Sequence, residues 1–240
     1  MFYLVAVASI FTASFFPFVV ITCLIVIHEI GHFLMAYLWG GEVLKILIYP
    51  LGGISKFTTS YNISILKEFL ILLFGPLFQF LAWFFLILLF PSKEHMISVY
   101  HFGILFFNLL PIYPLDGGKL LCLFFQLFLS YKRAFYLTFI CGYIFLLFIY
   151  FANFYSFSLN LVFIFMFLFI KLSQEVWQVP YFYEKFLLER YLNSYHFSKS
   201  RMIDNDNSFK RGYRHLIKEG DQYYLEREYL EKKYKKYKNC

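Results

Sequence analysis

The chain has 240 residues, of which 60% are hydrophobic and only 15% are charged. Soluble domains carry about 25% charged residues, so this composition excludes an ordinary soluble globular protein. The charge is also unevenly distributed, because 14 of the 22 Lys and Arg residues and 9 of the 15 Asp and Glu residues lie after residue 180. The sequence therefore predicts a membrane-embedded core over residues 1–180 and a basic, water-exposed cytoplasmic tail over residues 181–240.

Apolar stretches indicate where the chain crosses the membrane, because a helix needs about 20 such residues to traverse the hydrocarbon core. Six spans are predicted, at residues 2–13, 15–39, 65–90, 97–129, 133–152 and 157–178. Placing both termini in the cytoplasm puts nearly all the basic residues of the short loops on the cytoplasmic side, where such residues normally lie. We therefore expect an all-α polytopic membrane protein with six transmembrane helices, a re-entrant hairpin and a small cytoplasmic C-terminal region.

The second predicted span contains the motif H-E-x-x-H, formed by His28, Glu29 and His32. Residues four apart lie on one face of a helix, so both imidazoles can bind the same Zn²⁺ ion. Glu29 then flanks the metal without binding it and can act as a general base. The motif also arises by chance on the solvated faces of soluble helices. Within an apolar span, however, three ionisable side chains are costly, which favours a metal site.

The loop after this span contains an apolar segment, residues 46–57, that is too short to cross the membrane. Pro50, Gly52 and Gly53 lie at its centre. This pattern is typical of a re-entrant hairpin, whose irregular backbone is tolerated only against protein or water. Two roles are open for it: the hairpin either offers a strand edge to an extended substrate or only anchors the loop in the membrane.

The fourth predicted span is interrupted by Pro111 and Pro114, which prevent a continuous helix. Asp116 follows this break at membrane depth, whereas the other acidic residues of the core, apart from Glu29, lie near span ends beside lysines. A catalytic zinc site takes three protein ligands, and Asp116 is therefore the best third ligand. His95 and His101 are expected on the outer side of the membrane, away from the site.

Three motifs, in this order, resemble the signatures of the site-2 intramembrane zinc metalloproteases, and above all of the branch found in endospore-forming bacteria. The motifs are His28–His32, Gly75–Gln79 and Asn108–Gly118. The similarity covers roughly residues 1–190. The combination of the three motifs is specific, whereas each motif by itself is only moderately so.

The resemblance implies roles for individual residues. His28, His32 and Asp116 would bind one Zn²⁺ ion, and Glu29 would be the catalytic base. Asn108 would lie near the substrate or the water of the site, which agrees with the cost of an unpaired amide in lipid. The other residues expected to bind substrate or to line the site are Gln79, Pro50, Gly52 and Gly53.

The resulting hypothesis is hydrolysis of a peptide bond in a membrane-associated precursor. In the sporulation branch this substrate is a pro-sigma factor at the membrane surrounding the forespore. Inhibitory membrane proteins and the lipid bilayer are the other expected partners, nucleic acid is not expected as a direct partner, and a homo-oligomer is compatible with the sequence. Two alternatives stay open, an inactive scaffold that sequesters membrane partners and a metal transporter. The intact motif argues against the first, and the lack of repeated halves argues against the second.

The tail, residues 181–240, is rich in Lys, Arg, Glu and Tyr. Its last part, residues 224–236, predicts a solvated charged helix whose basic end is attracted to anionic lipid. In the sporulation branch this region resembles a cystathionine-β-synthase-type domain that responds to nucleotide and contacts the substrate, and residues 209–215 look like a piece of it. The segment is short for that fold, so contact with a substrate or partner is the preferred interpretation.

Overall fold

The computed structural model describes residues 15–39, 42–49, 52–58, 61–152, 159–193, 195–197 and 199–238. The predicted first span at residues 2–13 and the predicted site residue Pro50 lie outside them. The chain forms two compact units. The first comprises residues 1–59 and 66–109, and the second comprises residues 60–65 and 110–240.

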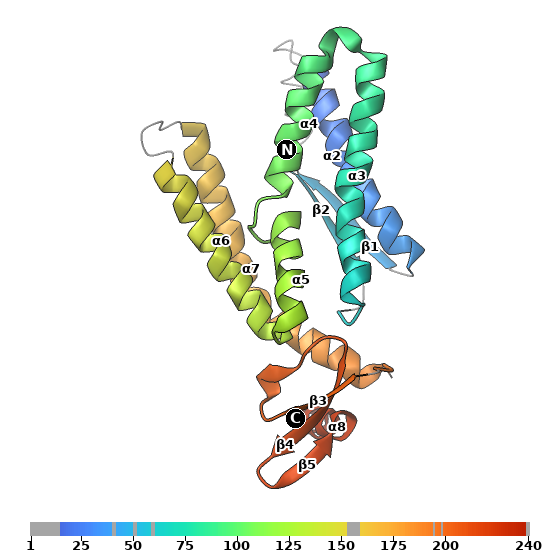
Figure 1. Ribbon diagram of the computed structural model, residues 1–240, viewed down its shortest axis with the longest axis vertical. Helices are drawn as coiled ribbons and strands as arrows, with labels where there is room; N and C mark the ends of the chain where they lie inside the picture. Colours follow the sequence, from blue (N-terminus) through green and yellow to red (C-terminus); the bar gives the residue numbers. More distant parts are fainter. Residues whose placement is uncertain are drawn as a thin grey trace. The chain divides into compact units, whose positions relative to one another are not determined.

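The described part of the first unit consists of helices and a β-hairpin (Figure 1). Its elements are α2 (Phe15–Leu38), β1 (Glu42–Tyr49), β2 (Gly52–Thr58), α3 (Ile65–Leu89), the 3₁₀ helix η1 (Pro91–Lys93) and α4 (Glu94–Asn108). The three helices lie side by side because Val20 and Leu24 of α2 form a buried apolar cluster with Ala82 of α3 and Ile97 of α4. This packing holds the middle of α2, which carries H-E-x-x-H, against its neighbours.

The apolar loop after α2 forms an antiparallel β-hairpin that contacts α2. Tyr49 pairs with Gly52 next to the turn, and Glu42 pairs with Thr58 at the open end. The chain therefore forms a hairpin where the sequence predicts one. The depth of this hairpin in a membrane stays a prediction. Because the hairpin is built of strands, the expectation of an all-α chain is wrong in this detail.

Four helices in the described part of the chain are long and apolar enough to cross a membrane: Phe15–Leu38, Ile65–Leu89, Tyr131–Ala152 and Val162–Leu192. They correspond to the second, third, fifth and sixth predicted spans. The predicted fourth span is instead divided between two shorter helices, α4 with 15 residues and α5 (Asp116–Phe128) with 13. The break between them contains Pro111 and Pro114, as expected from residues that cannot continue a helix.

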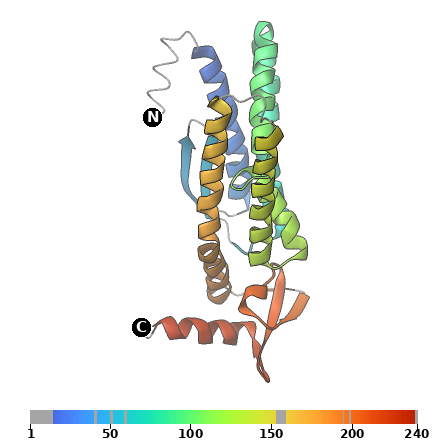
Figure 2. The same cartoon turned by 90° about the vertical axis from the view of Figure 1, so that its left-hand side faces the viewer.

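The described part of the second unit combines helices with a small sheet. Its elements are α5, α6 (Tyr131–Ala152), α7 (Leu159–Leu192), β3 (Lys199–Ile203), the 3₁₀ helix η2 (Asp206–Ser208), β4 (Tyr213–Glu219), β5 (Gln222–Leu225) and α8 (Glu226–Lys238). The helix α6 packs against both α5 and α7. The sheet has the order β3-β4-β5, with β3 parallel and β5 antiparallel to β4. The helix α7 continues through residue 180, and α8 runs crosswise to it (Figure 2).

A buried polar cluster ties the tail to the end of α7. The Arg190 guanidinium donates to Glu226 Oε1 at 2.7 Å through Nη1 and to Asn62 Oδ1 at 2.8 Å through Nε. The other carboxylate oxygen of Glu226 accepts from the backbone N–H of His215 at 2.7 Å. These four residues are all buried, so their polar atoms need partners within the protein, and this cluster supplies several of them. The tail is therefore fixed to α7 and to the segment before α3.

This cluster makes the tail sensitive to acid. Burial lowers the pKa of His215 below its ordinary value of 6.5. Burial raises the pKa of Glu226, but the hydrogen bond from His215 and the charge of Arg190 outweigh burial and hold that pKa below 4.5. In both cases the folded tail binds fewer protons than the unfolded tail. Its stability is therefore lost as the pH falls, below about 6.5 for His215 and below about 4.5 for Glu226.

Hydrogen exchange of the detergent-purified full chain, corrected for the intrinsic pH dependence, measures this loss. Amides of β4 and α8 should exchange faster at pH 5.5 than at pH 7.5, because His215 takes up a proton more readily in the unfolded tail than in the folded tail, and acid therefore favours unfolding. The variant His215→Asn should lose most of this difference. Equal protection of the wild-type tail at both pH values would contradict the prediction.

Candidate metal centre

The two histidines of H-E-x-x-H lie one turn apart on α2, in its middle and second half. Their side chains are buried, with 2% of His28 and 4% of His32 exposed. The helix forms here because the flanking residues are an unbroken apolar run, and the i, i+4 spacing places both rings on one face. The ring centroids are 4.8 Å apart and the rings are nearly perpendicular.

Each imidazole is held at its Nδ1 atom by a residue of α3. His28 Nδ1 lies 2.9 Å from the side-chain oxygen of Gln79, and His32 Nδ1 lies 2.8 Å from the backbone oxygen of Ile71. A carbonyl oxygen only accepts hydrogen bonds, so His32 carries its proton on Nδ1 and its Nε2 presents a lone pair. This is the arrangement that metal-binding histidines usually have.

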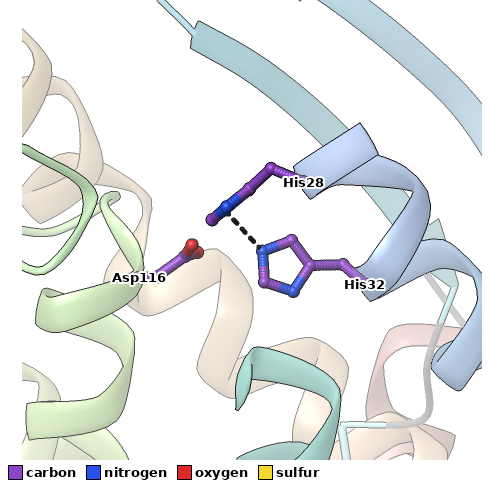
Figure 3. A group of neighbouring side chains, drawn as sticks. All are labelled: His28, His32 and Asp116. Carbon is purple, nitrogen blue, oxygen red and sulfur yellow. Dashed lines mark hydrogen bonds between the residues drawn. The ribbon is translucent and has the colours of Figure 1, made fainter. Parts of the chain in front are cut away.

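The two Nε2 atoms face each other at 3.1 Å, the contact dashed in Figure 3. Two nitrogens bound to one tetrahedral zinc at 2.0–2.1 Å lie about 3.3 Å apart. The spacing therefore fits two ligands of a single ion. When both Nδ1 atoms carry the protons, two lone pairs face each other, and a cation bound by both nitrogens relieves their repulsion.

Two glycines allow α2 and α3 to approach this closely. A Cβ atom on Gly75 would lie 2.3 Å from Cε1 and Nε2 of His32. A Cβ atom on Gly31 would lie 2.4 Å from the backbone oxygen of Phe74. The space that glycine leaves open at position 75 is thus filled by the ring of His32. Gly75, the first residue of the Gly75–Gln79 motif, therefore makes room for His32.

Asp116 belongs to the second unit, where it is the first residue of α5. Its side chain is buried, and its carboxylate accepts a hydrogen bond from Lys119 Nζ at 3.1 Å. A Cβ atom on Gly118 would lie 2.4 Å from the backbone nitrogen of Tyr113, so the loop between Pro111 and Pro114 folds closely against the start of α5. Figure 3 shows the carboxylate at the first turn of this helix.

The other predicted site residues occupy varied positions. Glu29 is half-buried on α2, and Asn108 is half-buried as the last residue of α4. Gln79 is completely buried, between His28 and α4. Gly52 and Gly53 are the first two residues of β2.

The expectation that His101 lies away from the site is wrong. It is completely buried on α4, and its backbone oxygen accepts a hydrogen bond at 3.0 Å from Gln79, the same side chain that contacts His28. Sequence reasoning also missed the backbone oxygen of Ile71 that holds His32. No local signal identifies either contact, because both depend on how α3 and α4 are rotated about their axes.

Two sequence comparisons identify the family. The sequence model of peptidase family M50 matches residues 16–95, which include the H-E-x-x-H motif. The chain is 30% identical over 197 residues to stage IV sporulation protein FB of Bacillus subtilis, an alignment that covers 79% of this chain and 68% of that protein. The chain belongs to peptidase family M50.

Two further matches to this M50 protein come from Methanocaldococcus jannaschii. A zinc metalloprotease from this organism is 32% identical over 124 residues, and this alignment covers 47% of the M50 chain but only 34% of the archaeal protein. The solved structure of a site-2 protease shares the fold, with a TM-score of 0.58 over 72% of this chain and 85% of that chain, at 23% identity. The M50 protein is thus a member of the site-2 family of intramembrane metalloproteases, and its apolar helices agree with an integral membrane protein.

Proposed function

We propose that this M50 protein is a zinc endopeptidase that hydrolyses a peptide bond of a membrane-associated precursor. His28, His32 and Asp116 hold one Zn²⁺ ion, and Glu29 is the catalytic base. The observation that carries the proposal is the pair of buried histidines on α2, whose Nε2 atoms lie 3.1 Å apart. The donor set of two imidazoles and one carboxylate also leaves the open position that a catalytic zinc site needs.

Each group of the site has its own role in the proposed reaction. Zinc bound in this site supplies a Lewis acid that acidifies water and polarises the scissile carbonyl. Glu29, next to His28 and only half-buried, accepts the proton of the attacking water and returns it to the leaving nitrogen. Asn108, at the end of α4, hydrogen-bonds the substrate or the water of the site.

The substrate must become extended, because a helix hides its peptide bonds. The β1–β2 hairpin is a two-stranded sheet that contacts α2, and an extended peptide can add to such a sheet as a further strand. We assign Pro50, Gly52 and Gly53 to the part of the hairpin that lines the site. In this proposal the hairpin guides the peptide towards the histidines of α2.

The substrate class follows from the relatives. Stage IV sporulation protein FB takes part in sporulation by its name, and its alignment with this chain extends over most of both proteins. We infer that the substrate is a pro-sigma factor or a similar membrane-tethered precursor, cleaved at the membrane surrounding the forespore. In this proposal both termini lie in the cytoplasm, and inhibitory membrane proteins restrain the enzyme.

Zinc content of the detergent-purified protein tests the site without knowledge of the substrate. We expect about one zinc per wild-type chain. His28→Ala and Asp116→Ala should lose or weaken it, because each removes one of three ligands. His95→Ala and Asp204→Ala are matched controls at exposed positions and should retain the metal. A folded wild-type protein without zinc affinity would contradict the proposal and favour an inactive scaffold.

A further inference from the structure

Gln79 connects the first histidine of the motif to a helix that carries no predicted ligand. It lies in the middle of α3 with none of its side chain exposed. Its Oε1 atom is 2.9 Å from His28 Nδ1, and its Nε2 atom donates at 3.0 Å to the backbone oxygen of His101 on α4. All three residues belong to the first unit.

The backbone oxygen of His101 fixes which way the amide of Gln79 points. A carbonyl oxygen has lone pairs and no proton, so it must face the NH₂ group of the amide. The amide oxygen is then left facing His28, and it accepts a hydrogen bond. The proton of the imidazole is therefore on Nδ1, and the lone pair is on Nε2, the atom that faces His32.

The position of His101 is itself secured by aromatic packing. Its ring stacks on Trp83 with centroids 5.1 Å apart and an interplanar angle of 19°. Phe80 contacts the ring edge-to-face at 4.7 Å between centroids, and Phe102 does so at 4.9 Å. Trp83 and Phe80 belong to α3, so their contacts with His101 hold α4 against α3 and keep the acceptor for Gln79 in place.

The two histidines differ in how their tautomers are set. His32 donates to the backbone oxygen of Ile71, which no substitution of that residue removes. The tautomer of His28 is set by the side chain of Gln79, which a substitution can remove. A hydrogen bond to the distal nitrogen orients a metal-binding imidazole and raises its basicity, and loss of such a partner typically weakens metal affinity 10–100-fold.

We propose that Gln79 is a positioning residue that holds His28 in the tautomer and orientation needed to bind zinc, and thereby sets the affinity of the site for the metal. The proposal rests on the zinc site of the proposed function. It assigns Gln79 a hydrogen bond to the metal-binding residue His28 instead of a contact with the substrate.

Zinc affinity measured by competition with a chelator tests this role in the full-length protein. Gln79→Leu keeps the approximate volume and removes the acceptor, and it should bind zinc 10–100-fold more weakly than the wild type. Gln79→Glu retains an acceptor for Nδ1–H, as in the carboxylate–histidine–zinc arrangement, but it loses the NH₂ donor to His101. Its affinity should therefore lie above that of Gln79→Leu. Gln126→Leu is the matched control, because Gln126 is also buried but contacts Cys122 and Arg211.

Several outcomes would overturn the inference. Wild-type affinity in Gln79→Leu, equal losses in Gln79→Leu and Gln79→Glu, or a similar loss in Gln126→Leu would each show that the acceptor at position 79 does not set the affinity. Nitrogen chemical shifts of His28 in the zinc-free wild type provide a readout that needs no variant, and they should report the Nδ1–H form. Failure of the wild type to bind zinc would instead contradict the proposed function, so the two failures are distinguishable.

Discussion

Glu29→Gln is expected to abolish cleavage of a membrane-tethered precursor while leaving about one zinc bound per chain. Glutamine has nearly the shape of glutamate but cannot accept the proton of the attacking water. Loss of a general base typically costs 10²–10⁴-fold in rate. His28 and His32 keep their partners on α3 in this variant, so metal binding should be unaffected.

The measurement compares precursor cleavage with zinc content for the same purified protein. Glu94→Gln is the matched control, because Glu94 is an exposed carboxylate in the first turn of α4 and should be replaceable without effect. Cleavage by Glu29→Gln at the wild-type rate would show that another group is the base. Loss of zinc from Glu29→Gln would show that Glu29 binds the metal.

Gly75→Ala should strongly lower the affinity for zinc, although it changes none of the proposed metal ligands. The added methyl would lie 2.3 Å from two atoms of the His32 ring, a distance at which something must move. The methyl is fixed to the backbone of α3, so the imidazole is the group displaced, and its hydrogen bond to Ile71 is lost with it. We expect zinc affinity to fall at least about 100-fold, the upper end of the effect of disturbing a ligand's support.

Gly103→Ala is the control for this substitution. Gly103 lies on α4, and a Cβ atom there would meet nothing within 4 Å. The substitution should leave zinc affinity unchanged and favour the helix slightly, because alanine has the higher helix propensity. If Gly75→Ala bound zinc as tightly as the wild type, His32 would have an alternative position from which to bind it, and the fit of its ring against Gly75 would be irrelevant to the site.

The sequence by itself determined the features that depend on local spacing. The i, i+4 separation of His28 and His32 places two imidazoles on one helical face wherever that helix lies. The four long apolar helices follow from runs of residues that are stable in lipid. The break before Asp116 follows from Pro111 and Pro114, because a proline inside a helix removes a hydrogen bond and clashes with the preceding turn. The chemistry of the site could therefore be predicted before its surroundings were known.

Only the tertiary structure decided what holds these residues in place. Gln79 is 51 residues from His28, Ile71 is 39 residues from His32, and Arg190 is 36 residues from Glu226 in the sequence. Such contacts depend on which face α3, α4 and α7 turn towards their neighbours. In a helix that is apolar on all sides, hydrophobic periodicity does not reveal this face. The sequence could therefore suggest the three metal ligands. The hydrogen-bond acceptors of His28 and His32, and the space at Gly75 that the ring of His32 fills, became visible only in the packed helices.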